Sequence, residues 1–170
     1  MGNSKLYKVG IIGPESTGKS TLATYLAHRY NGVLVPEYAR EYMEERACAC
    51  AYTYEDVENI AREQVRQLQA LQANAHRSRN EDKKSEFVFF DTELIITKVW
   101  FLHKFGSCPD FLSEAIQAYP MDVYLLCYPD MEWIPDPVRE NPDIREYLFD
   151  WYEREIQALD IPYYIIRHTT

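Results

Sequence analysis

The chain has 170 residues, which is enough for one domain with a central sheet covered on both faces but too few for a second independent domain. It carries 18 lysine and arginine residues against 27 aspartate and glutamate residues, and the net charge of −9 argues against nucleic acid or an anionic membrane as a partner. No apolar run approaches the roughly 20 residues of a membrane span and no signal-peptide core precedes residue 7, so we expect a cytoplasmic protein.

A phosphate-binding loop follows the first predicted strand. Residues 7–12 are typical of a buried strand, residues 13–20 read G-P-E-S-T-G-K-S, and apolar residues at helical spacing continue from residue 21. In such a G-x-x-x-x-G-K-[ST] loop, main-chain N–H groups and the helix N-terminus face a polyphosphate, Lys19 reaches the β- and γ-phosphates, and the Ser20 hydroxyl coordinates Mg²⁺. A chance match in an ordinary turn is the alternative. The loop and first helical turn predict an ATP site formed by Gly13, Glu15, Ser16, Thr17, Gly18, Lys19, Ser20 and Thr21.

An acidic residue follows the second predicted strand, at residues 32–35. The next residues, P-E-Y-A-R at 36–40, begin a helix and place Glu37 at the strand's carboxyl end, where ligands of open α/β sheets bind. There Glu37 would accept the proton of an acceptor hydroxyl or bind a ribose. The alternative is a first-turn glutamate that favours the helix dipole. Arg40 is expected to pair with Glu37 or a nearby carboxylate, or to bind phosphate.

A second carboxylate ends the third predicted strand. Residues 55–78 form a long amphipathic helix with Thr53 as its N-cap candidate, and residues 78–85 are polar and end it. The strand at 87–91, F-V-F-F-D, is apolar enough for burial on both faces and ends in Asp91. Phosphate-loop proteins place the second Mg²⁺ ligand at this position, so Asp91 is predicted to bind metal together with Ser20. Capping of the following helix is the alternative, and Asp91 can do both.

The remaining elements complete a parallel α/β pattern. We expect helices at 94–105, 111–118 and 144–159, and strands at 123–127 and 163–166. Strands that alternate with helices predict a three-layer α/β/α P-loop NTPase with a mainly parallel five-stranded sheet, of the nucleoside- and nucleotide-kinase type, as one domain over residues 1–170. The four cysteines, which form no C-x-x-C pair, are expected to be reduced: Cys48, Cys50, Cys108 and Cys127.

A proline-rich, charged segment follows the fourth predicted strand and is predicted to be a lid at residues 130–146. Such a segment can close over the phosphates, exclude water and supply an arginine to the γ-phosphoryl group. Arg139 is the first candidate for that role and Arg145 the second. The alternative is a solvated loop in which Arg139 pairs with a neighbouring carboxylate.

Aromatic and acidic residues gather in sequence near the predicted strand ends. Each aromatic alone is better explained by packing, but together these residues would suit a flat cationic ring through stacking and cation–π attraction. They are Tyr38, Tyr42, Trp100 and Trp133 with Glu37, Asp91, Glu93 and Asp136.

These motifs together resemble the ribosylnicotinamide kinase domain at the C-terminal end of bacterial NadR proteins and its stand-alone relatives. The matching segments span positions 13 to 139: G-P-E-S-T-G-K-S-T, P-E-Y-A-R, F-F-D-T-E with I-T, and W-I-P-D-P-V-R. The resemblance implies Mg²⁺-dependent transfer of the ATP γ-phosphate to the ribose 5′-hydroxyl of nicotinamide riboside, which gives nicotinamide mononucleotide and ADP.

The resemblance also assigns roles to residues of this sequence. Glu37 and Asp91 would handle the hydroxyl and the metal, Trp133 the nicotinamide ring and Arg139 the phosphates. Lys19, Glu37, Asp91 and Arg139 are the predicted catalytic residues. The predicted substrate-binding residues are Glu37, Tyr38, Arg40, Thr92, Glu93, Trp133 and Asp136.

The chain also departs from full-length NadR proteins. It has no H-x-G-H-like pair and no room for a DNA-binding segment, so neither adenylyl transfer nor repression is predicted. It stops at Thr170, just after the fifth predicted strand, where a further loop and a closing helix are expected.

Two other functions remain open from the sequence. One is a kinase of another nucleoside, such as a deoxynucleoside, or of another small hydroxylated metabolite, because only the acceptor pocket would differ. The other is a regulatory module that senses ATP and a nicotinamide compound without efficient turnover. A homo-oligomer is possible, but the sequence carries no readable signal for it.

Overall fold

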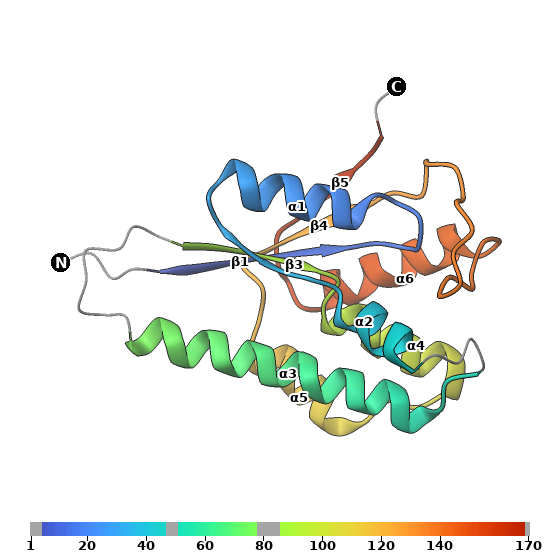
Figure 1. The fold of residues 1–170 in the computed structure, drawn as a ribbon, viewed down its shortest axis with the longest axis horizontal. Coiled ribbons are helices and arrows are strands. Elements are labelled where there is room, and N and C mark those ends of the chain that lie inside the picture. The colour runs from blue at the N-terminus through green and yellow to red at the C-terminus, as the bar shows by residue number, and fades with distance from the viewer. Residues whose placement is uncertain (1–4, 47–50, 78–85, 169–170) are drawn as a thin grey trace.

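Five parallel strands form one sheet in the computed structural model, which describes residues 5–46, 51–77 and 86–168 (Figure 1). The strand order is β2-β3-β1-β4-β5, and every neighbouring pair is parallel. The strands are β1 (Leu6–Ile12), β2 (Val33–Val35), β3 (Glu86–Asp91), β4 (Val123–Cys127) and β5 (Tyr163–Ile166). The predicted parallel five-stranded sheet is therefore confirmed.

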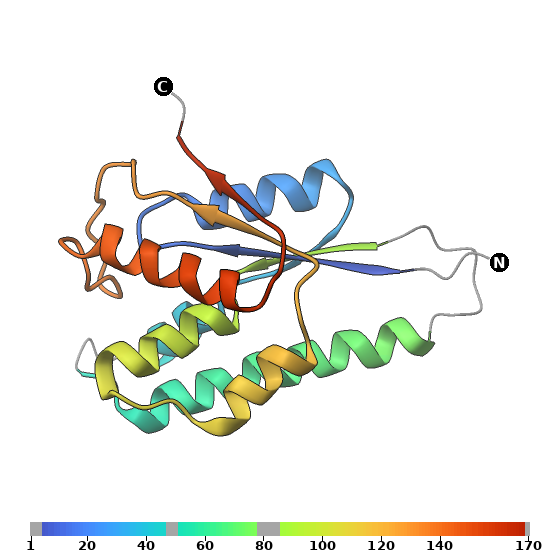
Figure 2. The same cartoon turned by 180° about the vertical axis from the view of Figure 1, so that it is seen from behind.

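Helices cover the two faces of this sheet unequally, as Figures 1 and 2 show from opposite sides. α1 lies on one face, and the other helices lie on the opposite side. The helices are α1 (Lys19–Arg29), α2 (Tyr38–Glu45), α3 (Tyr54–Arg77), α4 (Leu94–Phe105), α5 (Asp110–Ala118) and α6 (Arg145–Ala158). The three-layer α/β/α architecture is confirmed.

Two apolar cores correspond to these two faces. The smaller core joins α1 to the sheet through Val9, Ile11, Ala23, Ala27, Phe89 and Cys127. The larger core lies between the sheet and the opposite helices and includes Ile12, Val88 and Phe90. Because alternate residues of β1 and β3 enter different cores, both strands are buried on both faces, which explains their continuous apolar sequences.

Local sequence signals set the helix ends. The main-chain N–H of Asp56 donates to Thr53 Oγ1 at 3.3 Å, and the N–H of Thr53 donates to Asp56 Oδ2 at 2.7 Å. This reciprocal capping box confirms Thr53 as the N-cap of α3. α4 ends at Gly106, whose φ of 71° is a left-handed conformation that glycine adopts without steric cost.

The sheet register brings the predicted chemical groups to one edge. Ile11 of β1 pairs with Asp91 of β3, and Val35 of β2 pairs with Phe90. The phosphate loop, Glu37 and Asp91 therefore emerge side by side from three adjacent strands at their carboxyl ends, which is where such sheets bind ligands.

Other sequence-based expectations have structural counterparts where the chain is described. Cys108 and Cys127 are free thiols, whereas Cys48, Cys50 and the polar segment 78–85 lie outside the described residues. Within the ranges that the structure describes, none of the helices is both long enough and apolar enough to cross a bilayer.

Candidate active site

The phosphate loop is held by its own internal hydrogen bonds. The Pro14 carbonyl accepts hydrogen bonds from Thr17 Oγ1 at 2.8 Å and from Lys19 Nζ at 2.7 Å. Gly13 has a φ of 153°, and a Cβ atom there would lie 2.6 Å from the main-chain oxygen of Cys127. Gly18 has a φ of 77° and is the N-cap of α1. Glycine is required at both positions, because a side chain would clash at the first and strain the backbone at the second.

A hollow over this loop is lined by most of the residues that were predicted to bind ATP. Loop residues from Glu15 to Thr21 form one side, and Glu37, Arg40, Val138 and Arg139 form the other. The fold therefore brings Arg139, which lies more than 100 residues away in the sequence, to the same hollow as Lys19. The N-terminus of α1 adds a partial positive charge, which suits an anionic ligand.

A second hollow lies beside it and joins Ser20, Glu37 and Asp91. The Asp91 side chain is buried, and its Oδ1 atom has no hydrogen-bond partner among the described residues. An ionised carboxylate oxygen is unstable in such a position unless a cation or a donor compensates it. The donor set of one hydroxyl and one carboxylate fits Mg²⁺, which is usually bound by one or two protein oxygens together with phosphates and water.

A separate cage of protein ligands is not found. Within the described residues, no group of three or more histidine, cysteine, aspartate and glutamate side chains is arranged to hold a metal ion. The binding of Mg²⁺ by Ser20 and Asp91 stays a prediction.

Glu37 lines both hollows, and its surroundings act on its pKa in opposite directions. Burial of the side chain is the main cause that raises the pKa of Glu37, and the charges of Asp91 and Glu15 act in the same direction. The nearby Lys19 and Arg40 cations lower that pKa and offset part of the effect. A carboxylate with a raised pKa is a better proton acceptor than an ordinary one, which suits a general base.

Arg40 is engaged by carboxylates rather than free for phosphate. Its Nη1 atom lies 3.0 Å from Asp136 Oδ2, and its Nε atom lies 3.9 Å from Glu37 Oε2. Asp136 also accepts from the main-chain N–H of Val138 at 3.0 Å, and this bond, together with Arg40, lowers the pKa of Asp136. The predicted pairing of Arg40 with nearby carboxylates is found, and it ties α2 to the segment 130–146.

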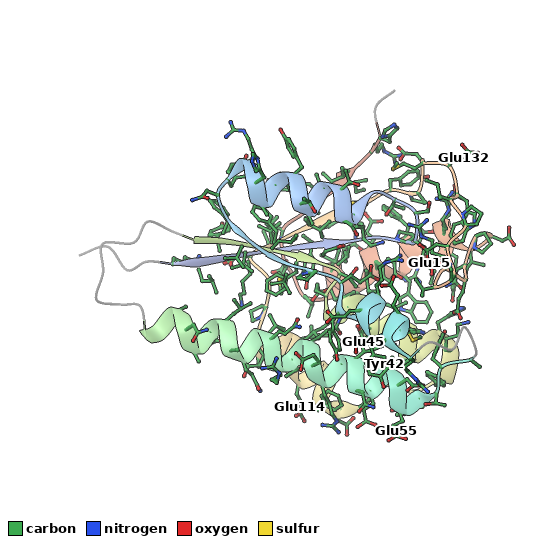
Figure 3. The ribbon with its side chains drawn as sticks, viewed as in Figure 1. Glu15, Tyr42, Glu45, Glu55, Glu114 and Glu132 are labelled. Carbon is green, nitrogen blue, oxygen red and sulfur yellow. The ribbon has the colours of Figure 1, made fainter. Side chains whose placement is uncertain are left out.

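That segment is also bound to the phosphate loop itself. The Glu15 carboxylate accepts the main-chain N–H groups of Glu140 at 3.1 Å and of Asn141 at 2.8 Å. Ser16 Oγ donates to the Glu132 carbonyl at 3.1 Å and accepts from the N–H of Ile134 at 3.0 Å. Glu15 and Glu132 lie at the same end of the molecule in Figure 3.

The arginines of this segment lie near the loop. Arg145 Nη1 donates to the Ser16 carbonyl at 3.2 Å, and its guanidinium group lies 5.8 Å from the centre of the Trp133 ring. Arg139 Nη1 donates to the Ile134 carbonyl at 2.5 Å, so its hydrogen bond is to the main chain rather than to a carboxylate. Both arginines are therefore close enough to the phosphate loop for the roles predicted for them.

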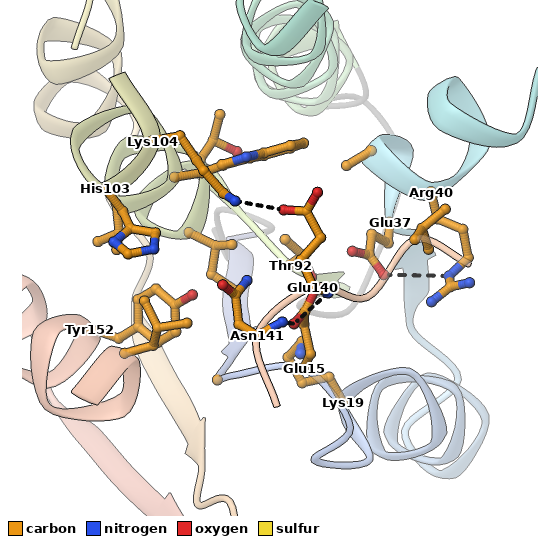
Figure 4. A pocket seen from close by; sticks show the side chains of 18 of the residues that line it. Glu15, Lys19, Glu37, Arg40, Thr92, His103, Lys104, Glu140, Asn141 and Tyr152 are labelled. Atoms are coloured by element: carbon orange, nitrogen blue, oxygen red, sulfur yellow. Dashed lines mark hydrogen bonds and ion pairs between the residues drawn. The ribbon is translucent and has the colours of Figure 1, made fainter. Parts of the chain in front are cut away.

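A third cleft extends from Lys19 and Glu37 between α2, α4 and α6. Figure 4 shows Lys19, Glu37 and Arg40 at one side and His103, Lys104 and Tyr152 at the other, with Glu140 and Asn141 between them. Its apolar lining comes from Ala39, Met43, Ile96, Val99, Trp100, Val138 and Leu148. A chamber of this kind can bury a ring-shaped acceptor while its hydroxyl faces the phosphate loop.

Thr92 lines the same cleft and combines two unusual features. Its φ is 71°, which is rare for a β-branched residue, and its buried Oγ1 atom has no hydrogen-bond partner among the described residues. Strained residues and unpaired polar atoms of this kind cluster at functional sites. Thr92 therefore fits its predicted role as a substrate-binding residue.

Glu93 takes a different position from the one expected of a substrate ligand. It is buried at the start of α4, where its Oε1 atom accepts the N–H of Ile95 at 2.9 Å as a helix N-cap. Burial raises the pKa of Glu93 to about 7. It is not among the residues that line the hollows described above, so contact with a substrate stays a prediction.

Two predicted aromatic residues do not line this cleft either. Trp133 is not among the residues that line it, and Tyr38 packs against Tyr42 with ring centres 6.2 Å apart. Tyr42 Oη donates to Asp56 at 3.1 Å, which joins α2 to α3. The assignments of Trp133 and Tyr38 to substrate binding stay predictions.

Sequence reasoning missed much of the cleft's far wall. The sequence-based site did not include the wall residues Met43, His103, Lys104, Glu140, Asn141 and Tyr152, and it gave Trp100 no assigned role. On α4 a signal was present, because Ile96, Trp100, His103 and Lys104 share one face at spacings of three and four residues. Periodicity identifies that face but does not say whether it faces a core or a cleft.

Comparisons with known proteins show what this chain is similar to. A family model described as "AAA domain" matches residues 8–170. The trifunctional NAD biosynthesis/regulator protein NadR of Escherichia coli (strain K12) is 27% identical over 133 residues, which is 77% of this chain and 30% of that protein. NadR of Salmonella typhimurium gives the same identity and coverage. The chain thus spans about a third of the length of these curated relatives.

Solved structures agree with the sequence comparison. A crystal structure of NadR protein in complex with NR has a TM-score of 0.74 and 25% identity, and the match covers 96% of this chain and 46% of that one. Thymidylate kinase from Ehrlichia chaffeensis has a TM-score of 0.64 at 12% identity, with 98% of this chain and 89% of that one covered. The second likeness shows a shared fold alone, and it confirms the predicted kinase-like architecture.

Proposed function

The chain belongs to the AAA domain family, and we propose that it is an ATP-dependent kinase that phosphorylates the 5′-hydroxyl of nicotinamide riboside. The observation that carries the proposal is the cleft that runs from Lys19 and Glu37 to a wall of aromatic and apolar side chains. It offers a place for an acceptor with a polar hydroxyl end and a flat ring. The homology to NadR, one structure of which is described as a complex with NR, supports nicotinamide riboside as that acceptor.

The proposed reaction uses groups that line the two hollows beside the phosphate loop. Glu37 accepts the proton of the 5′-hydroxyl as its oxygen forms a bond to the γ-phosphorus, and the bond from that phosphorus to the β–γ bridging oxygen breaks. Lys19 and Arg139 stabilise the negative charge of the transferring group. Ser20 and Asp91 would hold Mg²⁺, which neutralises charge on the β- and γ-phosphates when it is bound.

The segment 130–146 would exclude water from this reaction. Its hydrogen bonds to Glu15 and Ser16 hold it against the phosphate loop, and Val138 and Arg139 line the nucleotide hollow. A water molecule at the γ-phosphate would compete with the acceptor, so a closed segment favours transfer over hydrolysis.

An acceptor panel tests this proposal. ADP release would be measured with Mg·ATP and nicotinamide riboside, thymidine, deoxycytidine, adenosine or no acceptor, while mass spectrometry identifies the product. We expect nicotinamide mononucleotide that depends on the riboside, with one ADP for each product molecule. Phosphorylation of another nucleoside alone would keep the kinase and reject the proposed acceptor, and nucleotide binding without any product would favour a sensing module.

The pH dependence tests Glu37 in particular. Because the base must be ionised and burial raises its pKa, the transfer rate should rise with pH through a value above that of an ordinary glutamate. Glu37→Gln should abolish transfer while nucleotide binding persists. Substantial transfer by this variant would remove the proposed base.

A further inference from the structure

Glu140 makes contacts with both sides of the site at once. One of its carboxylate oxygens, Oε2, accepts a hydrogen bond from Tyr52 Oη at 2.7 Å and lies 3.1 Å from Lys104 Nζ. Its main-chain N–H donates to Glu15 Oε1 at 3.1 Å. Its side chain therefore binds the far wall of the cleft, and its backbone binds the phosphate loop (Figure 4).

The backbone on both sides of Arg139 is also held by hydrogen bonds. On the far side, the N–H of Asn141 donates to Glu15 Oε2 at 2.8 Å. On the near side, the N–H of Val138 donates to Asp136, which is paired with Arg40 of α2. Arg139 thus stands between two anchored neighbours, and its own backbone N–H donates to the Asp136 carbonyl at 3.0 Å.

The far-wall partners of Glu140 are themselves packed in place. The Tyr52 ring meets Trp100 edge to face with centres 4.9 Å apart, and the Lys104 ammonium lies 5.9 Å from the centre of the Tyr52 ring. The side chains of Lys104 and Glu140 are 34% and 38% exposed, so their ion pair is only partly screened by solvent. The contact with Trp100 holds the Tyr52 ring, and Tyr52 and Lys104 together offer Glu140 an attachment point on the acceptor side.

We propose that Glu140 is a positioning residue that holds Arg139 over the phosphate loop from the acceptor side of the site. The role of Arg139 rests on the proposed function, whereas the anchoring of the backbone by Glu140 does not. Without the Lys104 and Tyr52 contacts, the backbone at 138–141 keeps the Glu15 bonds but loses its attachment to the far wall. A displacement of about 1 Å at a catalytic group can cost about 100-fold in rate.

Kinetics of matched variants test this role. Glu140→Ala should lower kcat for transfer by about 10- to 100-fold and leave the affinity for the unreactive analogue AMP-PNP nearly unchanged, because the loop still binds the phosphates. Lys104→Met, which removes the partner from the other side, should have a similar effect. Glu114→Ala is the control, since Glu114 is exposed on α5 and lines none of the hollows of the site.

The double variant separates positioning through Lys104 from independent damage. If Glu140 acts through Lys104, Glu140→Ala with Lys104→Met should be no slower than the slower single variant. The proposal would be overturned if the losses of kcat in the two single variants multiplied in the double variant. It would also be overturned by a normal kcat in Glu140→Ala, or by an AMP-PNP affinity that falls as much as kcat.

A measurement without an acceptor keeps this test apart from the proposed function. Hydrogen exchange of the amides at 138–141, followed in the AMP-PNP complex, should be faster in Glu140→Ala and Lys104→Met than in the Glu114→Ala control. Faster exchange in a protein that phosphorylates no riboside would retain the anchoring and reject the acceptor. Unchanged exchange would reject the anchoring whatever the acceptor is.

Discussion

Asp91 illustrates how much of the site depends on a single side-chain oxygen. Its Oδ1 atom is buried without a hydrogen-bond partner among the described residues, at the end of a strand whose preceding residues are apolar. A buried polar atom in that state costs about 1–3 kcal/mol. The proposed role of Asp91 as a ligand of Mg²⁺ would account for this cost.

Replacement of Asp91 should therefore separate activity from stability. Asp91→Asn keeps the shape but removes the charge, and we expect transfer to fall by at least about 100-fold while the free energy of unfolding is equal or higher. Steady-state kinetics and urea unfolding measure the two effects. Asp150→Asn on the exposed side of α6 is the control. An Asp91→Asn variant with near-normal transfer would contradict the metal-binding role.

Glu93 should make the stability of the protein depend on pH. Burial disfavours the charged form and raises the pKa of Glu93 from its ordinary value of 4.5 to about 7 in the folded chain. Between these values the folded state holds a proton that the unfolded state has lost. Stability is therefore greatest below about pH 4.5 for this group, and it falls as the pH rises to about 7.

The size of that loss can be tested with one variant. A shift from 4.5 to about 7 corresponds to about 3 kcal/mol, and Glu93→Gln, which can still accept the N–H of Ile95, should remove that part of the pH dependence. Urea unfolding at pH 5 and pH 8 would compare wild type, Glu93→Gln and the exposed control Glu146→Gln. An identical slope with pH in wild type and Glu93→Gln would show that Glu93 ionises without cost.

At the scale of elements, one buried polar pair joins α4, which lines the cleft, to α3, which does not. Thr97 Oγ1 of α4 donates to Gln64 Oε1 of α3 at 2.7 Å, and both side chains are buried. Because Thr97 also lines the cleft, the packing of α3 fixes the acceptor wall at this point.

Removal of one partner from this pair should destabilise the fold. Thr97→Val leaves the Gln64 amide unpaired and should cost about 1–3 kcal/mol, whereas the double variant with Gln64→Leu should recover much of the loss. Urea unfolding measures both values, and Thr24→Val on the exposed face of α1 is the control. Equal stability of Thr97→Val and wild type would mean that Gln64 finds another partner.

The sequence predicted the elements well because each carries its own local signal. The long period-3.6 pattern matches α3 at Tyr54–Arg77, and the apolar strands with a terminal loop or acid match β1 and β3. Strand order could not be read in the same way. The pairing of β1 with both β3 and β4 depends on which apolar faces meet, and all these strands are similarly apolar.

The site was predicted in part for the same reason. Asp91 ends β3, Glu37 comes shortly after β2, and the loop that carries Lys19 and Ser20 follows β1, so a parallel sheet brings them to one edge. The far wall, with Lys104 and Tyr152, comes from helices whose orientation is set by tertiary packing. The orientation of these helices depends on many side chains, and no short sequence motif predicts it.

For the molecule as a whole, nucleotide binding should be visible as stability. At a ligand concentration of 100 times Kd, binding adds about 2.7 kcal/mol, which for a chain of this size raises Tm by about 5–10 °C. Thermal unfolding with Mg·AMP-PNP should show this shift in wild type, and Lys19→Ala should lose it without a lower Tm in the absence of ligand. A shift retained in full by Lys19→Ala would place nucleotide binding elsewhere.

The central position of β1 in the sheet has a consequence for folding during synthesis on the ribosome. β1 is synthesised first, yet its two neighbours begin only at Glu86 and Val123. The ribosome adds about 5–20 residues per second, so β4, the second neighbour of β1, is completed on the order of 10 s after β1. Until β3 has been made, β1 has no neighbouring strand to pair with, and early chaperone contact with the nascent chain should concentrate there.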